Sequence, residues 1–240
     1  MWTSASEQKQ IEDAVYTPDY AGYRNDPVFE QAIRSLLDSA IVPRLSHGAR
    51  ILDVGCGSGD FLAAAKERGF KPTGIDISEA GARLCRQRGF EACSGDFLTA
   101  AFGTEFDAVT MWDVIEHLRD PGAFFERSHS ILQGDGLFIG KVPAFGRISV
   151  ELSKRVPRFA GMLLGAPDHV QYFTQKSLGA LLQRTGFKVE WLHPPVNRLR
   201  GRRRGGSFKR RLGRSFASAI KGISRDGNLY FVASLDQSGR

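Results

Sequence analysis

The stretch ILDVGCGSG at residues 51–59 decides the fold. It predicts a buried β-strand that ends at Asp53, a loop built on Gly55, Gly57 and Gly59, and then a helix. A backbone that turns sharply and approaches a ligand closely needs residues without Cβ, and the first turn of a helix offers unpaired N–H groups. The stretch therefore predicts a ligand-binding loop, with G-x-G-x-G spacing rather than the dinucleotide-binding G-x-G-x-x-G.

The chain around this loop alternates between two types of segment. Short apolar stretches are followed by stretches whose apolar residues recur with the 3.6-residue spacing of a helix. The predicted strands are Arg50–Val54, Pro72–Ile75, Phe106–Met111 and Leu137–Val142, and the predicted helices are Phe61–Arg68, Ala80–Arg88, Gly122–Leu132 and Lys176–Thr185. This order indicates βαβ units, and hence a parallel sheet covered by helices on both faces.

Residues that favour helix ends stand at the boundaries of these helices. Predicted N-terminal caps are Ser58, Ser78 and Thr174. The glycines expected just after helix ends are Gly69, Gly89, Gly134 and Gly186.

The pattern changes in the second half of the chain. Phe187–Leu192 predicts a further strand, and Asn228–Leu235 predicts a last strand that adds an antiparallel edge to the sheet. We expect one domain over residues 1–240 with three additions, which are an N-terminal cap at 1–47, a lid at 143–173 and a basic insertion at 194–227.

Composition places the chain among ordinary globular proteins. Of 240 residues, 42% are apolar and 25% are charged, which excludes a wholly disordered chain. No run approaches the ~18 apolar residues of a membrane span, and the first residues lack the order of an export signal, so we expect a cytoplasmic protein. Cys56, Cys85 and Cys93 lack metal-binding spacing, and we expect reduced thiols in small apolar pockets.

Acidic residues stand at the ends of the strands that follow the glycine loop. Asp76 ends the next predicted strand, where a carboxylate can accept hydrogen bonds from both hydroxyls of a ribose. Asp96 ends what would be a third strand, and Phe97 beside it offers a flat apolar surface for a purine. These positions predict recognition of an unphosphorylated ribose and its base.

The motifs resemble those of the class I S-adenosylmethionine-dependent methyltransferases. The resemblance rests on LDVGCGSG at 52–59, GIDIS at 74–78, GDF at 95–97, FDAV at 106–109 and WDVIEHL at 112–118. It covers residues 48–192 and implies a doubly wound α/β fold. That Rossmann-like fold has a mostly parallel seven-stranded sheet of order 3-2-1-4-5-7-6 with an antiparallel last strand. It also implies S-adenosyl-L-methionine as the cofactor.

The resemblance assigns a cofactor site residue by residue. Its expected members are Asp53, Gly55, Gly57 and Gly59 for the methionine part, Asp76 for the ribose, Asp96 and Phe97 for the adenine, and Cys56, Ile77 and Trp112 beside them. Because the sulfonium of the cofactor activates the methyl group, the protein mainly aligns a nucleophile behind that group. An alcohol or catechol nucleophile also needs a base, or a metal ion that lowers its pKa.

A second cluster follows the fourth strand, near the expected acceptor position. If residues 113–118 form a helical turn, the spacing of Asp113, Glu116 and His117 places their side chains on one face. His169, in PDHVQYFT at 167–174, belongs to a segment that resembles one in quinone-biosynthesis O-methyltransferases. In the small-RNA 3′-end 2′-O-methyltransferases a similar cluster with a later histidine binds a divalent ion.

Three interpretations of this cluster stay open. Glu116 and His117 can form a hydrogen-bonded pair that shapes the acceptor pocket. His117 or His169 can act as a metal-free base. Asp113, Glu116, His117 and His169 can together hold a divalent metal, because carboxylates with imidazole suit Mg²⁺, Mn²⁺ or similar ions. The catalytic candidates are therefore Glu116, His117 and His169.

The positive charge of the chain is concentrated in residues 196–225. This segment holds 11 of the 33 Lys and Arg residues and no Asp or Glu, which leaves 22 basic against 26 acidic residues elsewhere. Apolar residues recur there every three or four positions between basic ones, as in a helix on a membrane surface. Docking on anionic lipid, a solvated loop and contact with RNA stay open. Nucleic acid is favoured least, because Phe208 and Phe216 share the apolar side.

We therefore expect methyl transfer from S-adenosylmethionine to an oxygen of a small or lipid-linked acceptor, such as a quinone precursor or a glycan intermediate. With a lipid-linked acceptor, the protein would sit peripherally at the inner membrane surface. The alternatives are an RNA methyltransferase that uses residues 196–225 on phosphates, and a non-catalytic cofactor-binding scaffold. The fold alone does not choose the acceptor.

Overall fold

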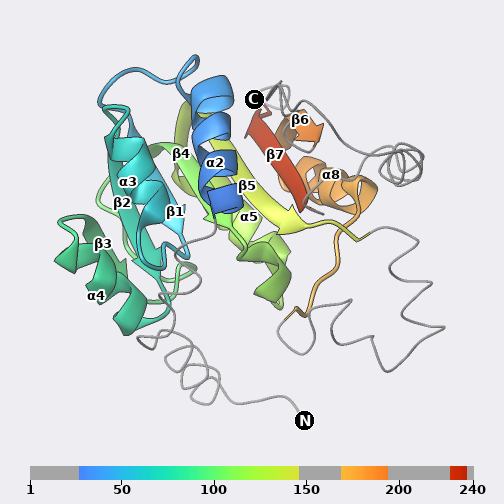
Figure 1. Cartoon of the computed structure of the whole chain (residues 1–240). Helices are drawn as coiled ribbons and strands as arrows, with labels where there is room; N and C mark the ends of the chain where they lie inside the picture. Colours follow the sequence, from blue (N-terminus) through green and yellow to red (C-terminus); the bar gives the residue numbers. More distant parts are fainter. Residues whose placement is uncertain (1–26, 146–168, 194–227, 237–240) are drawn as a thin grey trace, which may run out of the picture.

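A computed structural model describes residues 27–145, 169–193 and 228–236. These residues build a seven-stranded sheet of order β3-β2-β1-β4-β5-β7-β6, with β3 at one edge and β6 at the other (Figure 1). The strands are β1 Arg50–Val54, β2 Lys71–Asp76, β3 Glu91–Ser94, β4 Phe106–Trp112, β5 Leu132–Pro143, β6 Phe187–His193 and β7 Asn228–Leu235. β7 runs antiparallel to both of its neighbours, and the pairs among β1 to β5 are parallel, so the predicted topology is confirmed.

Helices cover both faces of the sheet, and each face has its own apolar core. The helical segments are α2 Pro27–Leu36, η2 Leu37–Ile41, α3 Asp60–Lys66, α4 Glu79–Gln87, η3 Ile115–His117, α5 Pro121–Ile131 and α8 Gln175–Arg184. Leu52 of β1 packs with Phe125 of α5 and Leu182 of α8 on one face. Its neighbour Ile51 packs with residues of α2 and α3 on the other face, because successive side chains of a strand point to opposite sides.

The helix ends confirm two predicted caps and correct a third. The side chains of Ser78 and Thr174 accept backbone N–H groups at the starts of α4 and α8. The predicted cap Ser58 is wrong, because α3 begins one residue later with Gly59 as its N-cap. The Ser58 hydroxyl instead donates to Asp60 Oδ2 at 3.1 Å. The left-handed φ of +82° at Gly59 explains why a glycine stands at this cap.

The junction between α5 and β5 also differs from the prediction. We expected Gly134 to follow the end of a helix before a strand at 137–142, but β5 already begins at Leu132 and contains Gly134. The pairing with β4 shifts register between Phe106 and Ala108, and Gly134 lies in the irregular part with a φ of +43°. The helix thus passes directly into the strand, and the glycine serves a bulge rather than a helix end.

The predicted additions to the domain lie partly outside the described residues. In the N-terminal cap, residues 27–41 form α2 and η2, and Ile33, Leu36 and Ile41 are buried in the core beside β1 and β4. Residues 1–26 of the cap, 146–168 of the lid and 194–227 of the basic insertion lie outside the described part of the chain. Within that part, none of the helices is both long and apolar enough to span a membrane.

The three cysteines lie in the described part of the chain, form no disulfide there and differ in burial. Cys56 and Cys85 are buried, with their sulfur atoms 3.6 Å apart. The hydrogen bond from Cys85 and burial raise the pKa of the Cys56 thiol, so this thiol is neutral. Cys93 is exposed, which corrects the prediction of an apolar pocket there. β3 is an edge strand whose residues are mostly exposed, so few neighbouring residues cover its side chains.

Candidate active site

The predicted site residues lie along the end of the sheet where β1 to β5 have their carboxyl ends, which we call the carboxyl edge. Asp76 and Trp112 are the last residues of β2 and β4, and Asp96 lies two residues after β3. The glycine loop leaves β1 at the same edge, because these strands are parallel. Ligands of open α/β sheets bind at this edge, where the strand order reverses beside β1.

The glycine loop has the backbone that its sequence predicts. Gly55, Gly57 and Gly59 have φ values of +73°, +49° and +82°, which glycine adopts without steric cost. A Cβ on Gly55 would lie 2.4 Å from Cγ2 of Val114, the second residue after β4. The loop is therefore packed directly against the segment that carries Glu116 and His117.

Asp76 holds the glycine loop against β2. Its Oδ2 accepts the Gly57 N–H at 2.8 Å, and its Oδ1 accepts the Ser78 N–H at 2.9 Å. The carboxylate is buried at the strand end. Each oxygen of a carboxylate can accept a further hydrogen bond, so this arrangement is compatible with the predicted contact to a ribose.

Asp53 lies deeper in the same part of the site. The Thr110 hydroxyl donates to Asp53 Oδ1 at 2.7 Å across the pairing of β1 with β4. Burial raises the pKa of Asp53 to about 8, although the bond from Thr110 acts in the opposite direction and the charge of Asp76 adds to the rise. The carboxyl group of Asp53 is therefore protonated near neutral pH, and a nearby cation would favour its anionic form.

The residues predicted to contact the adenine differ in their exposure to solvent. Asp96 is exposed and accepts the Leu98 N–H at 2.9 Å. Phe97 is 3% exposed, because its ring packs against Phe102 and Phe124, so the open face predicted for it is absent. Leu98, 37% exposed, and Ile77, 48% exposed, are the apolar side chains open to solvent after β3 and β2. Ile77 is among the predicted site residues and Leu98 is not, and contact of either with adenine stays a prediction.

The side chains of Cys56 and Trp112 are buried in the apolar core rather than open to solvent. The Cys56 side chain packs within the core beside α3, and Trp112 packs against Phe61 with ring centroids 5.3 Å apart. The indole Nε1 of Trp112 is buried and has no hydrogen-bond acceptor among the described residues. Their contact with a cofactor stays a prediction.

The helical face predicted for residues 113–118 is wrong at its first member. Asp113 has a left-handed φ of +54° and precedes η3, which covers Ile115–His117 alone. Its side chain turns to β5, where Lys141 Nζ donates to Asp113 Oδ2 at 2.5 Å. Asp113 is therefore not grouped with the other metal-ligand candidates, because its carboxylate is paired with Lys141. Sequence reasoning missed Lys141, a charged residue within the apolar run of β5.

Glu116, His117 and His169 come together as a cluster. One potential ligand atom of each lies within 4.8 Å of the others, and the two imidazole rings are 5.0 Å apart, edge to face. Glu116 is 1% exposed, and neither carboxylate oxygen has a hydrogen-bond partner among the described residues. Burial, and then the charge of Asp113, raise the pKa of Glu116 to about 8, although Lys141 lowers it.

Backbone hydrogen bonds bring His169 to this cluster across more than fifty residues of sequence. The N–H groups of Val170 and Gln171 both donate to the Glu116 carbonyl at 2.9 Å. The same segment continues along the end of β5, where the Phe145 N–H donates to the Phe173 carbonyl at 2.9 Å. The position of His169 is therefore fixed by main-chain contacts with η3 and β5.

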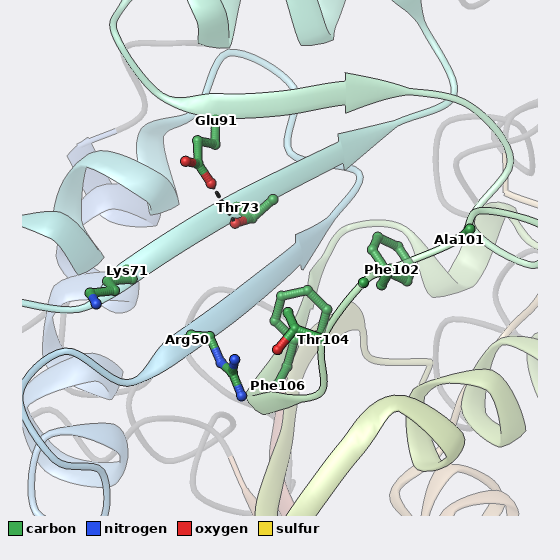
Figure 2. A pocket seen from close by; sticks show the side chains of 9 residues that line it. Arg50, Lys71, Thr73, Glu91, Ala101, Phe102, Thr104 and Phe106 are labelled. Atoms are coloured by element: carbon green, nitrogen blue, oxygen red, sulfur yellow. Dashed lines mark hydrogen bonds between the residues drawn. The ribbon is translucent and has the colours of Figure 1, made fainter.

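A pocket of about 310 Å³ lies at the amino ends of the strands, away from these residues (Figure 2). Arg50, Lys71, Glu91 and Phe106, which line it, are the first residues of β1 to β4. None of the predicted site residues contributes to it, so it is separate from the carboxyl-end site.

Comparisons with known proteins agree with this architecture. A family model described as a methyltransferase domain matches residues 23–192. A ubiquinone biosynthesis O-methyltransferase of Pseudomonas aeruginosa is 26% identical over 159 residues, a match that covers 60% of this chain and 66% of that protein. The chain thus matches slightly less than two thirds of the length of this curated relative.

Solved structures share the fold at low sequence identity. The magnesium protoporphyrin IX methyltransferase of Synechocystis, with bound S-adenosylhomocysteine, has a TM-score of 0.64 and 15% identity over 95% of this chain and 100% of its own. The 1,6-didemethyltoxoflavin-N1-methyltransferase of Burkholderia thailandensis has a TM-score of 0.62 and 17% identity over 99% and 92%. Since the family model covers well over half of the sequence, this chain belongs to the class I S-adenosylmethionine-dependent methyltransferases.

Proposed function

We propose that the protein transfers a methyl group from S-adenosylmethionine to a hydroxyl oxygen of a small or lipid-linked acceptor. Family membership supports the cofactor, and the relative named as an O-methyltransferase supports oxygen as the target. The site has a cofactor half, formed by the glycine loop and the strand-end acids, and an acceptor half, formed by Glu116, His117 and His169. The two halves lie side by side, because Val114 of the segment that leads to Glu116 packs against Gly55 of the glycine loop. Such proximity is what an in-line displacement requires of the protein.

The cofactor half is proposed to use the loop and the strand-end acids. Asp53 is suited to the cationic methionine part, because a neighbouring cation would offset the burial that raises its pKa to about 8. Asp76 is suited to the ribose, and Ile77 and Leu98 offer apolar surface for the adenine. The bound cofactor supplies an activated methyl group, so these residues act by binding and orientation.

The acceptor half is proposed to hold a divalent cation on Glu116, His117 and His169. The observation that carries this proposal is the buried Glu116 carboxylate, whose two oxygens have no hydrogen-bond partner among the described residues and which lies within reach of two imidazoles. A buried, unpaired carboxylate is costly unless a cation or proton compensates it. A carboxylate with two histidines is a donor set that fits a first-row transition ion or Mg²⁺.

A cation held there would lower the pKa of an acceptor hydroxyl, and it would favour acceptors with two adjacent oxygens, such as catechols. The residues of the chain then have separate tasks. Glu116 supplies the negative charge, His117 and His169 supply neutral nitrogen ligands, and the exposed Val170 and Tyr172 next to His169 offer apolar surface for an aromatic ring. This chemistry favours the metal over the metal-free base and the pocket-shaping interpretations.

Turnover of a simple catechol tests the proposal. The protein would be incubated with S-adenosylmethionine and 3,4-dihydroxybenzoate, with Mn²⁺ or with a chelator, and methylated product measured. We expect turnover that the chelator abolishes and that Glu116→Gln lowers at least tenfold, because removal of a ligand to a catalytic ion has effects of this order or larger. The matched control is Glu126→Gln on the exposed side of α5, which should retain full turnover. Undiminished turnover with chelator would refute the metal.

A lipid-linked acceptor is the finer form of this proposal. The residues that flank the basic insertion, His193 and Asn228, lie at the same carboxyl edge as the site, because β6 runs parallel to β5 and β7 antiparallel. Sedimentation with anionic and zwitterionic vesicles tests contact with a membrane surface. Preference for anionic vesicles would support it, and equal or absent binding would remove it. Salt-dependent binding of RNA instead would favour the RNA methyltransferase.

A further inference from the structure

Lys141 and Asp113 join each other where the two halves of the site meet. Lys141, in β5, is 8% exposed, and its Nζ donates to Asp113 Oδ2 at 2.5 Å. The Asp113 N–H also donates to the Lys141 carbonyl at 3.2 Å. A side-chain ion pair and a main-chain hydrogen bond therefore tie the same residue of the turn to β5.

The backbone that this ion pair holds is unusual. Asp113 is the single non-glycine residue with a positive φ within the described ranges, at +54°. The left-handed conformation is unfavourable for most residues with a side chain, although aspartate adopts it more readily than most, so it persists where its surroundings determine it. The turn redirects the chain from β4 into η3, which carries Glu116 and His117.

The same turn touches the cofactor loop on its other side. Val114 occupies the space that a Cβ of Gly55 would need. Downstream, the Glu116 carbonyl accepts the N–H groups of Val170 and Gln171, next to His169. The segment 113–117 thus lies between β5, the glycine loop and the His169 segment, and Lys141 is its charged contact with β5.

We propose that Lys141 is a positioning residue for methyl transfer. Its ion pair with Asp113 holds the left-handed turn, and the turn places Glu116 and His117 beside His169 and Val114 against the cofactor loop. Since the ammonium group is engaged by Asp113, Lys141 acts through the turn and takes no part in the reaction itself. This inference rests on the proposed function of the Glu116, His117 and His169 cluster.

The test compares Lys141→Met, which removes the charge at similar volume, with Lys141→Arg, which keeps it. The control is Lys188→Met, on an exposed position of β6. Calorimetry measures the affinity for S-adenosylhomocysteine, and kcat and KM are measured for 3,4-dihydroxybenzoate with Mn²⁺. We expect Lys141→Met to lower kcat roughly tenfold or more with cofactor affinity within about twofold, because a misplaced reacting group costs rate rather than binding. Lys141→Arg should recover part of the loss.

If Lys141→Met does not fold, Asp113→Asn replaces it, because asparagine tolerates a left-handed backbone but carries no charge. It should show the same loss of kcat. Equal losses of cofactor affinity and kcat, or an arginine variant as impaired as the methionine variant, would overturn the proposal.

Amide exchange separates this proposal from the proposed function. If the wild type neither binds Mn²⁺ nor methylates the catechol, the proposed function fails. The positioning role of Lys141 is then tested by hydrogen exchange at Val170 and Gln171. Their N–H groups donate to the Glu116 carbonyl, so their exchange rates report whether that carbonyl stays in place. We expect faster exchange at both in Lys141→Met and unchanged exchange at Gly57, which Asp76 binds. Unchanged exchange at Val170 and Gln171 would overturn the positioning role.

Discussion

Asp76 in the cofactor half and Glu116 in the acceptor half are both buried, but their carboxyl oxygens differ in hydrogen bonding. Asp76, on the cofactor side, has both oxygens occupied by backbone N–H groups of the loop and of the α4 N-terminus. Glu116, on the acceptor side, has neither oxygen occupied among the described residues. Backbone groups therefore stabilise the Asp76 anion, whereas burial without hydrogen bonds favours the protonated form of Glu116 unless a cation compensates its charge.

Gly55→Ala is expected to have the largest effect, because it damages both halves together. A Cβ there would lie 2.4 Å from Cγ2 of Val114, and a φ of +73° strains any side chain. Affinity for S-adenosylhomocysteine and turnover should both fall about 100-fold, in line with a combined cost of a few kcal/mol. Gly89→Ala is the matched control, since its φ is +78° but its Cβ would meet open space. Equal effects of the two variants would show that strain alone, rather than the contact with Val114, matters.

Asp76→Ala should break the cofactor half alone. It removes the acceptor of two buried N–H groups and the predicted ribose contact, so affinity for S-adenosylhomocysteine should fall roughly 30-fold or more, as for the loss of charge-assisted hydrogen bonds. Mn²⁺ affinity should stay within about twofold, because Asp76 is not a member of the Glu116, His117 and His169 cluster. Calorimetry of both ligands checks this, with Asp38→Ala on the exposed surface as the control. Joint loss of both ligands would mean that the halves are not separable.

Asp53→Asn should change how the free energy of unfolding depends on pH. The folded-state pKa of about 8 lies above the ordinary value near 3.9, so the proton-bound form favours folding and this contribution is lost as pH rises from about 4 to 8. The asparagine variant cannot titrate, so its free energy of unfolding relative to the wild type should increase over that range and stay constant above pH 8. Urea unfolding at pH 5, 7 and 9 measures it. A constant difference would contradict the raised pKa.

Cofactor affinity should show the complementary trend. Pairing of Asp53 with the cationic methionine part requires the anion, so binding below pH 8 must release a proton. Wild-type affinity for S-adenosylhomocysteine should therefore rise with pH towards 8, by up to about tenfold per unit, while Asp53→Asn should bind weakly and without this slope. A flat wild-type profile would remove Asp53 from the cation contact.

Leu98→Ala is expected to have the smallest effect. Leu98 is 37% exposed in the structure, so covering its remaining surface with adenine contributes about 1 kcal/mol at most, or up to fivefold in cofactor affinity. Val42→Ala, on a similarly exposed residue of the N-terminal helical layer, is the control and should change nothing. Loss of more than tenfold would indicate that Leu98 is part of the loop structure rather than a surface for the base.

The strands and the glycine loop could be predicted because their causes are local. Most of the strands contain an apolar run, β3 being the exception, and the loop needs glycine at three positions of positive φ. The errors arose where a distant residue decides the outcome. Phe97 is buried by Phe102 and Phe124, and Asp113 is turned away from Glu116 by Lys141, which follows it by 28 positions. No periodicity or spacing marks a non-glycine residue as left-handed.

The acceptor cluster was predictable in membership but not in geometry. Glu116 and His117 stood out because they follow the fourth strand together, and His169 because its segment resembles one in related methyltransferases. What joins them is the Glu116 carbonyl, which accepts two main-chain N–H groups from the His169 segment. Such main-chain bonds carry no side-chain signature, so the sequence alone could not show that the three side chains meet while Asp113 stays apart.

The most direct test of the contrast between the halves is a Mn²⁺ titration of the wild type and of Glu116→Gln, followed by calorimetry with S-adenosylhomocysteine on both. The account predicts that the wild type binds one Mn²⁺, that Glu116→Gln loses this binding by at least tenfold, and that both bind S-adenosylhomocysteine with affinities within about twofold. Absence of Mn²⁺ binding in the wild type, or unchanged binding in Glu116→Gln, would contradict the claim that the buried Glu116 carboxylate binds a divalent cation.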